Sequence, residues 1–214
     1  MFWKVSTTFG LLHASHIVST LPLPTLQSLL SNAGLPHLAT NSSSSVTVVT
    51  FVFASPPSQI HPPGFGYLIP RPKNGYENST NPEGVLGVVF DSCSLDAQDQ
   101  PRGQITKLTM MIGGPYPQLP QIGDPASLGV LLLGTLERHF GRRLPRPVHV
   151  EVTHRQQCIP VPTPGHLCRM GELRGALEKD PWNGRMEIIG AGVGGVSVGD
   201  CVQQGRDVGK NWGL

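Results

Sequence analysis

The apolar positions of the chain fall into short runs that are broken by proline, glycine and asparagine. The run VTVVTFVFA at 46–54 is almost continuously β-branched and aromatic, which predicts a strand covered on both faces or lying at a sheet centre. The runs GFGYLIP at 64–70, GVLGVVFDS at 84–92 and ITKLTMMIGG at 105–114 predict three more strands. VHVEVTH at 148–154 alternates apolar and polar positions, so it predicts a further strand of the same sheet.

Weaker runs come before this sheet. WKVS at 3–6 and HIVSTLP at 16–22 predict two short strands on either side of a hairpin-like stretch. PTLQSLLSNAGL at 24–35 predicts a short helix with Gly34 as its C-cap. The serine run at 42–45 is more typical of a loop than of an ordered element.

Two longer helices and a closing unit are expected in the second half. Asp124 followed by Pro125 is a typical helix start, and a leucine-rich stripe carries that helix to about Gly141. After the proline-punctuated segment at 158–166, a second helix is predicted over 169–179. Since strands and helices do not alternate regularly, the predicted fold class is α+β, with a mixed sheet, flanking helices and one closing βα unit.

Composition and charge narrow the function classes. The 214 residues include 26 glycines and 21 prolines, and the formal net charge of +2 gives no basic stripe, so nucleic-acid binding is not expected. The four cysteines lack zinc-ligand spacing, so we expect reduced, partly buried thiols and no metal site. No apolar run approaches the roughly 20 residues of a spanning helix, so any membrane contact is expected to be peripheral. The first residues predict neither a secretory nor a mitochondrial leader.

The segment MEIIGAGVGG at 186–195 places Gly190, Gly192 and Gly195 in the pattern G-x-G-x-x-G behind a predicted strand. A dinucleotide fingerprint also needs a second strand with an acidic residue about 20 residues further on. Only 19 residues follow Gly195. A terminal βα unit is therefore favoured over a nucleotide fingerprint.

The wider sequence resembles a known family. The stretch GAGVGGVSVGDCVQQGRDVG at 190–209 is similar to the C-terminal flavin motif of the protoporphyrinogen oxidases, a family of amine-oxidase-like flavoproteins. WKVS, HIVSTLP, GFGYLIP, GVLGVVFDS, LTMMIGG, CIP and GH at 165–166 resemble further blocks in the family's order, with wording nearest to fungal members. The chain departs from the family's Ile-Pro-Gln-Tyr at 159–162 and carries Val193 and Gly194 at aromatic or acidic positions. The family's N-terminal glycine fingerprint has no counterpart here.

This resemblance implies an α/β flavoprotein fragment. Residues 1–45 and 165–214 would be parts of an FAD-binding domain, and 46–164 would form the sheet and helix of a substrate domain. The implied reaction oxidises protoporphyrinogen IX to protoporphyrin IX with FAD and dioxygen, producing hydrogen peroxide, in haem synthesis. The mitochondrial inner membrane as location and a homo-oligomer as assembly are further implied expectations.

The resemblance also assigns site residues. The positions that correspond to flavin contacts are Ala191, Val196, Ser197 and Val198. The positions that match the lining of the tetrapyrrole pocket are Phe65, Gly66, Leu68 and Met111. N–H groups at 196–198 would open a helix, where the dipole favours an anionic partner such as a reduced flavin. No catalytic side chain is implied, because the flavin carries the oxidation.

Several alternatives stand beside these assignments. The small residues near 190–198 could serve only close helix–strand packing, and the pocket positions could be ordinary sheet core. Asp200 either stabilises the start of the last helix or reaches the flavin. His149, His154 and His166 are expected to be structural or solvent-facing. The whole chain could be a non-catalytic fragment without the ADP-binding half of the flavin site, and another amine-oxidase-like flavoprotein would need an aromatic pair that is not visible.

Overall fold

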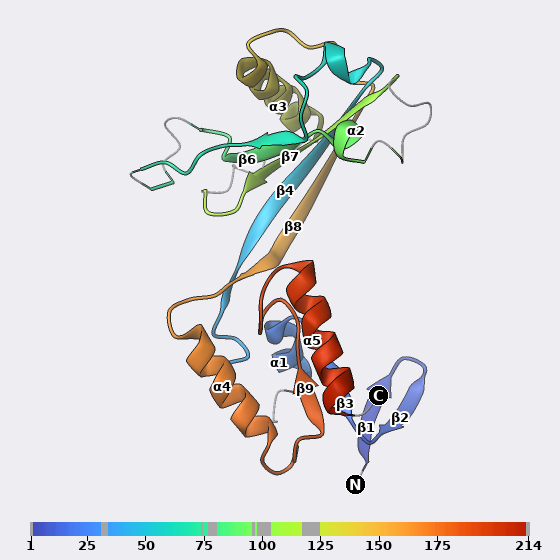
Figure 1. Cartoon of the computed structure of the whole chain (residues 1–214), viewed down its shortest axis with the longest axis vertical. Helices are drawn as coiled ribbons and strands as arrows, with labels where there is room; N and C mark the ends of the chain where they lie inside the picture. The colour runs from blue at the N-terminus through green and yellow to red at the C-terminus, as the bar shows by residue number, and fades with distance from the viewer. Residues whose placement is uncertain are drawn as a thin grey trace. The chain divides into compact units, whose positions relative to one another are not determined.

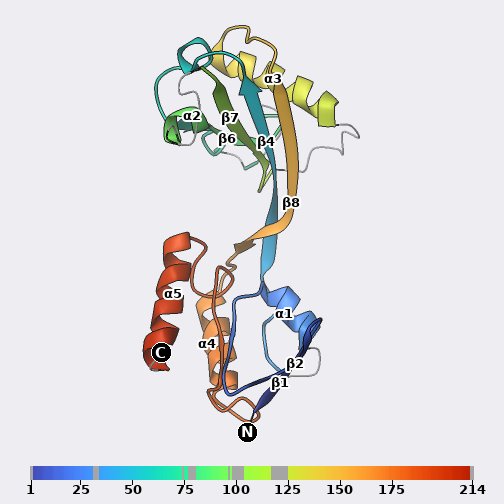
Figure 2. The ribbon, with the colours of Figure 1, turned by 90° about the vertical axis from the view of Figure 1, so that its right-hand side faces the viewer.

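The computed structural model describes residues 2–30, 34–73, 75–76, 81–95, 97, 104–116 and 125–212. The chain divides into two compact units, one made of Met1–Ser43 with Ile159–Leu214 and the other of Ser44–Cys158. We call them unit 1 and unit 2. Figures 1 and 2 show their elements in two views.

Unit 2 is built on a five-stranded sheet with the order β5-β6-β7-β4-β8. The strands are β4 (Ser42–Phe53), β5 (Gly66–Leu68), β6 (Val85–Val89), β7 (Thr106–Gly113) and β8 (His149–Val161). The pairs β5–β6, β6–β7 and β4–β7 are antiparallel. The 3-10 helix η1 (Pro57–Gln59) and the helices α2 (Asp91–Ser94) and α3 (Pro125–Phe140) complete the unit.

One face of this sheet is buried under α3. Burial alternates strictly along β7, and its buried positions share a core with Val49, Phe51 and Phe53 of β4. Leu132 and Leu136 of α3 lie in the same core and are fully buried. The predicted sheet is therefore confirmed. Only one face of the run at 46–54 is fully buried, because every second position of β4 is half-buried.

Unit 1 combines small sheets with three helices. Its elements are β1 (Trp3–Thr7), β2 (Gly10–Ala14), β3 (Ile17–Ser19), α1 (Leu23–Leu29), α4 (His166–Leu177), β9 (Met186–Ile188) and α5 (Val198–Asn211). β1 and β2 form an antiparallel hairpin, whereas β3 pairs in parallel with β9 from the other end of the chain. The helices α1 and α4 enclose a core that includes Leu26, Leu173 and Trp182.

The secondary structure of three segments differs from the prediction. The hairpin-like stretch between the first two predicted strands contains a strand of its own, β2, which pairs with β1. The serine run at 42–45 opens β4 instead of forming a loop. The proline-punctuated segment after Cys158 continues β8 to Val161, and a proline is tolerated there because β8 lies at the sheet edge.

The helix ends differ in detail. α1 ends at Leu29 with Leu30 as its C-cap, so Gly34 is not the cap, although its φ of 65° is left-handed. α4 starts at His166, three residues before the predicted start. α3 ends at Phe140 and is followed by Gly141 with a φ of 64°, as predicted. The predicted cap at Asp124 lies outside the described residues.

Candidate functional site

The glycine segment of unit 1 forms the turn between β9 and α5, so the predicted terminal βα unit is confirmed. Ser197 is the N-cap of α5 and forms a capping box with Asp200. The Asp200 N–H donates to the Ser197 hydroxyl oxygen at 3.1 Å, and the Ser197 N–H donates to the Asp200 carboxylate at 3.2 Å. Asp200 therefore stabilises the helix start, which is the structural alternative for this residue.

The predicted flavin positions surround this helix start. Val198 is the first helical residue, its side chain is 81% exposed, and Val196 is also exposed. Ala191 lies half-buried in the turn. Within the described residues, the N–H groups of Val198 and Gly199 have no hydrogen-bond partner, as expected for the first turn of a helix. The start of α5 thus keeps two outward donors, while the Ser197 N–H is already used.

Gln204 of α5 holds the turn against the helix. Its side-chain oxygen accepts from the Gly190 N–H at 2.9 Å, and its side-chain nitrogen donates to the Asp200 carbonyl at 3.2 Å. A Cβ on Gly194 would lie 2.6 Å from Cδ of Gln204, and one on Gly195 would lie 2.5 Å from Oδ2 of Asp200. These glycines therefore permit close packing of the turn on α5.

A second set of contacts reaches the turn from α4. Nε2 of His166 lies 3.1 Å from the Val193 carbonyl, and its Nδ1 lies 3.1 Å from the Asn41 amide nitrogen. Arg169 donates to the Asn41 side-chain oxygen at 3.1 Å. The structural role expected for His166 is thereby confirmed. Sequence reasoning missed Gln204 and Asn41, because no short motif marks a residue that acts by reaching back to a distant turn.

In unit 2, three of the four predicted pocket residues lie on one face of the sheet. Leu68 pairs with Gly87, and Gly87 pairs with Met111. Leu68, Gly87 and Met111 therefore lie in one row across β5, β6 and β7. Residues directly opposite in antiparallel strands share a face, and this row lies on the face away from the α3 core. Gly66 lies two residues before Leu68 on the same face.

The Leu68 side chain covers the centre of the row, where Gly87 is buried. A Cβ on Gly87 would lie 2.9 Å from Cδ2 of Leu68, so the Leu68 side chain occupies the space above this glycine while remaining 77% exposed. Gly66 has a φ of 150°, and a Cβ there would lie 2.3 Å from the Val88 carbonyl oxygen. Gly66 is thus required for strand packing. Phe65 lies just before β5 and is exposed.

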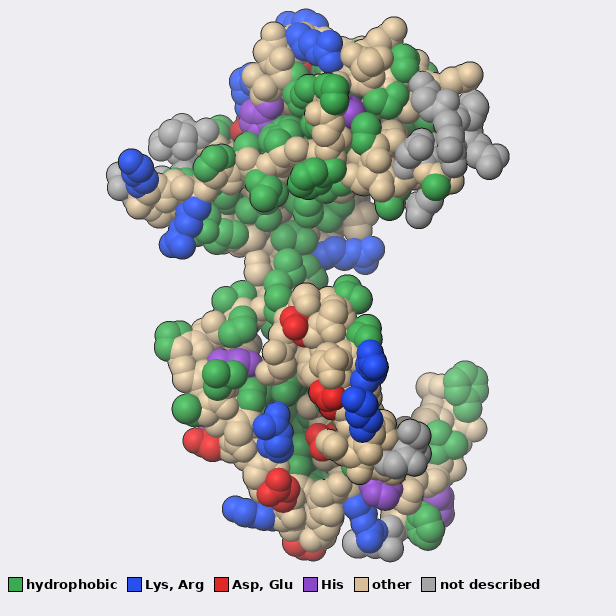
Figure 3. Space-filling model, viewed as in Figure 1, with side chains coloured by type: hydrophobic (Ala, Val, Ile, Leu, Met, Phe, Trp, Pro, Cys, Tyr) green, Lys and Arg blue, Asp and Glu red, His purple; other side chains and the backbone are tan. Residues whose placement is uncertain are grey.

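Figure 3 shows apolar side chains gathered over the sheet of unit 2. Val48, Val52 and Met111 on this face are half-buried. Thr50 and Thr109 lie opposite each other between them, with their hydroxyl oxygens 3.4 Å apart. The described part of this face therefore carries apolar side chains at the Met111 end, followed by the two threonines and then by Lys107 opposite Val52.

The titratable groups with altered pKa values lie toward α3. Burial raises the pKa of the Tyr67 phenol, whose oxygen lies 2.7 Å from Nδ1 of His139. Burial and the charge of Arg138 lower the pKa of His139. Burial alone would raise the pKa of the Glu83 carboxyl. The net shift is downward, because this carboxyl is hydrogen-bonded to Arg138, to its own backbone and to Thr135, and because Arg138 is positively charged. These groups stabilise the helix on the sheet and are not on the open face.

Other predicted features have simple positions. The histidines of β8 have the structural or solvent-facing positions that were predicted, because Nδ1 of His154 lies 2.8 Å from the Thr47 hydroxyl and His149 is exposed beside Glu151.

All four cysteines are free, but Cys93, Cys158 and Cys168 are exposed, so their predicted partial burial is wrong. Within the described ranges, no three His, Cys, Asp or Glu side chains gather as a metal site would need. None of the helices described is long and apolar enough to cross a membrane.

The fold is shared with several solved structures. A structure from Exiguobacterium sp. 255-15, described as a candidate protoporphyrinogen oxidase, superposes with a TM-score of 0.74 at 22% identity, over 98% of this chain and 43% of that one. Cyclohexylamine oxidase from Brevibacterium oxydans superposes with a TM-score of 0.54 at 16% identity, over 90% of this chain and 40% of that one. The predicted fold class is therefore confirmed.

The sequence comparison is more specific. Human protoporphyrinogen oxidase is 30% identical over 211 residues, which are 95% of this chain and 41% of the human protein. The Schizosaccharomyces pombe protoporphyrinogen oxidase is 31% identical over 175 residues, which are 78% of this chain and 32% of that protein. No protein-family model matches the chain. The chain is related to the protoporphyrinogen oxidases over almost its whole length and spans less than half of theirs, so the predicted resemblance is confirmed.

Proposed function

We propose that this chain supplies the C-terminal part of the flavin and substrate sites of a protoporphyrinogen oxidase. The proposed reaction oxidises protoporphyrinogen IX to protoporphyrin IX with FAD and dioxygen and yields hydrogen peroxide. The observation that carries the proposal is the 30% identity to the human enzyme along 95% of the chain. A match of that extent includes both the βα unit and the five-stranded sheet, which are the two regions that the activity would need.

The start of α5 fits one anionic edge of a flavin. Val198 and Gly199 present two unpartnered N–H groups at a helix N-terminus, and the neighbouring side chains are exposed. A bound flavin would supply the acceptor for hydride, and helix donors favour the negative charge that its ring then carries. Ala191 would border the same turn. Asp200 adds a negative charge nearby, but its carboxylate is held by Ser197.

The open face of the sheet fits a large apolar substrate. Leu68, Gly87 and Met111 form a row without a charged side chain, and aliphatic and thioether groups suit the surface of a tetrapyrrole. Phe65 and Gly66 lie at one end of this row. We propose that these residues bind the porphyrinogen and leave the redox chemistry to the flavin.

A second candidate function is that of a non-catalytic fragment. The chain spans 41% of the human relative, and its glycine segment at 190–195 lies in the βα unit of β9 and α5. Under this alternative, the chain folds but retains no FAD without another chain. Peripheral contact with the mitochondrial inner membrane and a homo-oligomeric state belong to the enzyme proposal.

The first experiment is an absorbance spectrum of the full chain after incubation with FAD and desalting. Retained flavin near the protein's molar concentration would support the enzyme, and an assay with protoporphyrinogen IX would follow. A colourless protein would support the fragment. The colourless protein would then be mixed with a separately expressed N-terminal half of the human relative. Flavin retained by the mixture would show that the two chains complete a site together.

A matched pair of variants tests the helix start. Val198→Pro removes one N–H donor while keeping the helix, because proline suits the first helical position and Ser197 has an extended ψ of 154°. Val198→Ala removes the side chain but keeps the donor. We expect the proline variant to weaken FAD binding about tenfold and the alanine variant to change it little. Equal affinities in both variants would remove the Val198 N–H from the flavin site.

A further inference from the structure

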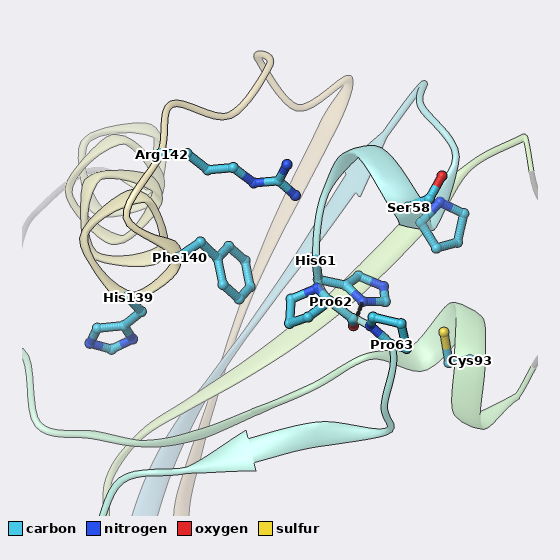
Figure 4. Close-up of a pocket in the computed structure, with 9 residues that line it drawn as sticks. Ser58, His61, Pro62, Pro63, Cys93, His139, Phe140 and Arg142 are labelled. Atoms are coloured by element: carbon cyan, nitrogen blue, oxygen red, sulfur yellow. Dashed lines mark hydrogen bonds between the residues drawn. The ribbon is translucent and has the colours of Figure 1, made fainter.

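Unit 2 contains a pocket of about 660 Å³ that lies apart from the row of Leu68 and Met111 (Figure 4). Its walls come from η1 and the loop after it, from α2, and from the C-terminal end of α3. Its volume lies within the range of small-molecule sites, roughly 300–1,000 Å³. The proposed oxidase function gives this pocket no role.

Arg142 supplies the fixed charge of the pocket. Its side chain extends from the turn after α3 toward the loop that carries His61, as Figure 4 shows. The guanidinium forms no ion pair within the described residues, and no carboxylate lines the pocket. The helix end does not need this side chain, because the N–H groups of Gly141 and Arg142 already donate to the carbonyls of Arg138 and Glu137. The guanidinium is therefore available for an anion.

The other walls are flat and apolar. Phe140 lines one side, and the rings of Pro62 and Pro63 line the opposite side (Figure 4). Beside the prolines, the His61 ring is 3% exposed, stacks on Phe90 at 4.0 Å and has its Nδ1 2.8 Å from the Pro62 carbonyl. Since that carbonyl can only accept, Nδ1 donates and Nε2 is left as a buried atom without a partner. Nε2 is buried and out of reach of a ligand in the pocket, so the accessible surfaces of these walls are the apolar ones.

We propose that this pocket binds a small organic carboxylate that carries a flat ring. The carboxylate pairs with Arg142 at the rim, and the ring lies between Phe140 and the two prolines. A planar carboxylate matches the two parallel donors of a guanidinium, and an aromatic ring gains most from the flat walls. This site is independent of the flavin and of the proposed oxidation.

The test titrates 4-fluorobenzoate into the full chain and follows its fluorine resonance by NMR, with no flavin present. We expect saturable line broadening for the unmodified chain and about tenfold weaker binding for Arg142→Gln. The neutral probe 4-fluorobenzamide should bind about tenfold more weakly than the acid and should not respond to that substitution. Acetate should not compete, because it lacks the ring.

Arg143→Gln is the matched control. Arg143 is the next residue along the same turn and is exposed, but its guanidinium pairs with Glu137 at 3.1 Å and does not line the pocket. This variant should bind 4-fluorobenzoate within about twofold of the unmodified chain. Equal losses in the two variants, or no saturable binding by the unmodified chain, would overturn the proposal. Near-ultraviolet circular dichroism of the tyrosines confirms that each variant keeps unit 2 folded.

Discussion

The two units place their candidate sites on different kinds of structure. In unit 1 the site is a backbone turn, where Gln204 and the cap at Ser197 fix the positions of N–H groups. In unit 2 it is a row of side chains on a sheet whose other face is fully packed under α3. Substitution of a single glycine can therefore disrupt the site in unit 1, whereas the site in unit 2 depends on the core beneath the sheet.

Their cores differ as well. Unit 2 buries a continuous core between five strands and one long helix. Unit 1 pairs β3 with β9 in a two-stranded parallel sheet and relies on α1 and α4 for most of its buried side chains. Parallel strands usually occur in larger sheets with both faces covered. We therefore expect unit 2 to be the more stable of the two.

Aromatic residues allow the two units to be followed separately. The three tryptophans of the chain, Trp3, Trp182 and Trp212, all lie in unit 1. The three tyrosines, Tyr67, Tyr76 and Tyr116, all lie in unit 2. Tryptophan fluorescence thus reports the unfolding of unit 1, and the fluorine resonances of incorporated fluorotyrosine report that of unit 2.

The largest expected effect comes from Phe51→Ala in the core of unit 2. Phe51 is fully buried, so its truncation should lower the free energy of unfolding by about 3–5 kcal/mol. In urea, the tyrosine transition should move to lower concentration while the tryptophan transition stays in place. The reciprocal variant Leu173→Ala in unit 1 should move only the tryptophan transition. Coincident shifts of both signals would show that the units unfold as one and would remove the comparison.

A smaller effect is expected from the ion pair between Glu83 and Arg138. Because the folded-state pKa of Glu83 is lowered, its stabilisation is complete above the ordinary value of 4.5 and is lost as the pH falls below it. Glu83→Gln should lower the free energy of unfolding of unit 2 by about 1–2 kcal/mol at neutral pH and by less at pH 3. Urea titrations at several pH values measure this difference.

The control for this pair is Glu151→Gln. Glu151 is an exposed carboxylate of the same unit, with His149 4.0 Å away. An exposed pair of this kind contributes little, so the tyrosine transition should be unchanged at both pH values. If the two glutamine variants lost equal stability, the buried position of Glu83 would have no special role.

The sequence predicted elements well where local pattern and tertiary packing agree. The run at 46–54 is β-branched and aromatic and formed a strand, and the leucine stripe has a helical period and formed α3. The serines at 42–45 were misread because partners from other strands decide their state. The Ser45 carbonyl accepts from Gly114 at 2.9 Å, and the Ser45 hydroxyl accepts from Gln157. No local signal contains those pairings.

The candidate sites show the same limit. Val198 and Ser197 could be placed at a helix start from their spacing after the glycines, and they lie there. The row of Leu68, Gly87 and Met111 depends on strand register, and the register is set by hydrogen bonds between segments about 20 residues apart. The pocket at Arg142 could not be predicted, because its walls come from three separate segments.

The smallest expected effect sharpens the account of the glycine turn. Gly205 lies inside α5, is exposed, and has no atom within 4 Å of the position of an added Cβ. Gly205→Ala should therefore stabilise unit 1 by about 0.5–1 kcal/mol and raise its tryptophan-monitored melting temperature by a few degrees. Gly194→Ala makes the same chemical change in the turn, where the new Cβ would meet Gln204, so it should lower that temperature. If both variants raised the melting temperature, close packing between the turn and α5 would not be the reason for glycine at 194. The Ser197–Asp200 cap alone would then position the backbone donors at Val198 and Gly199.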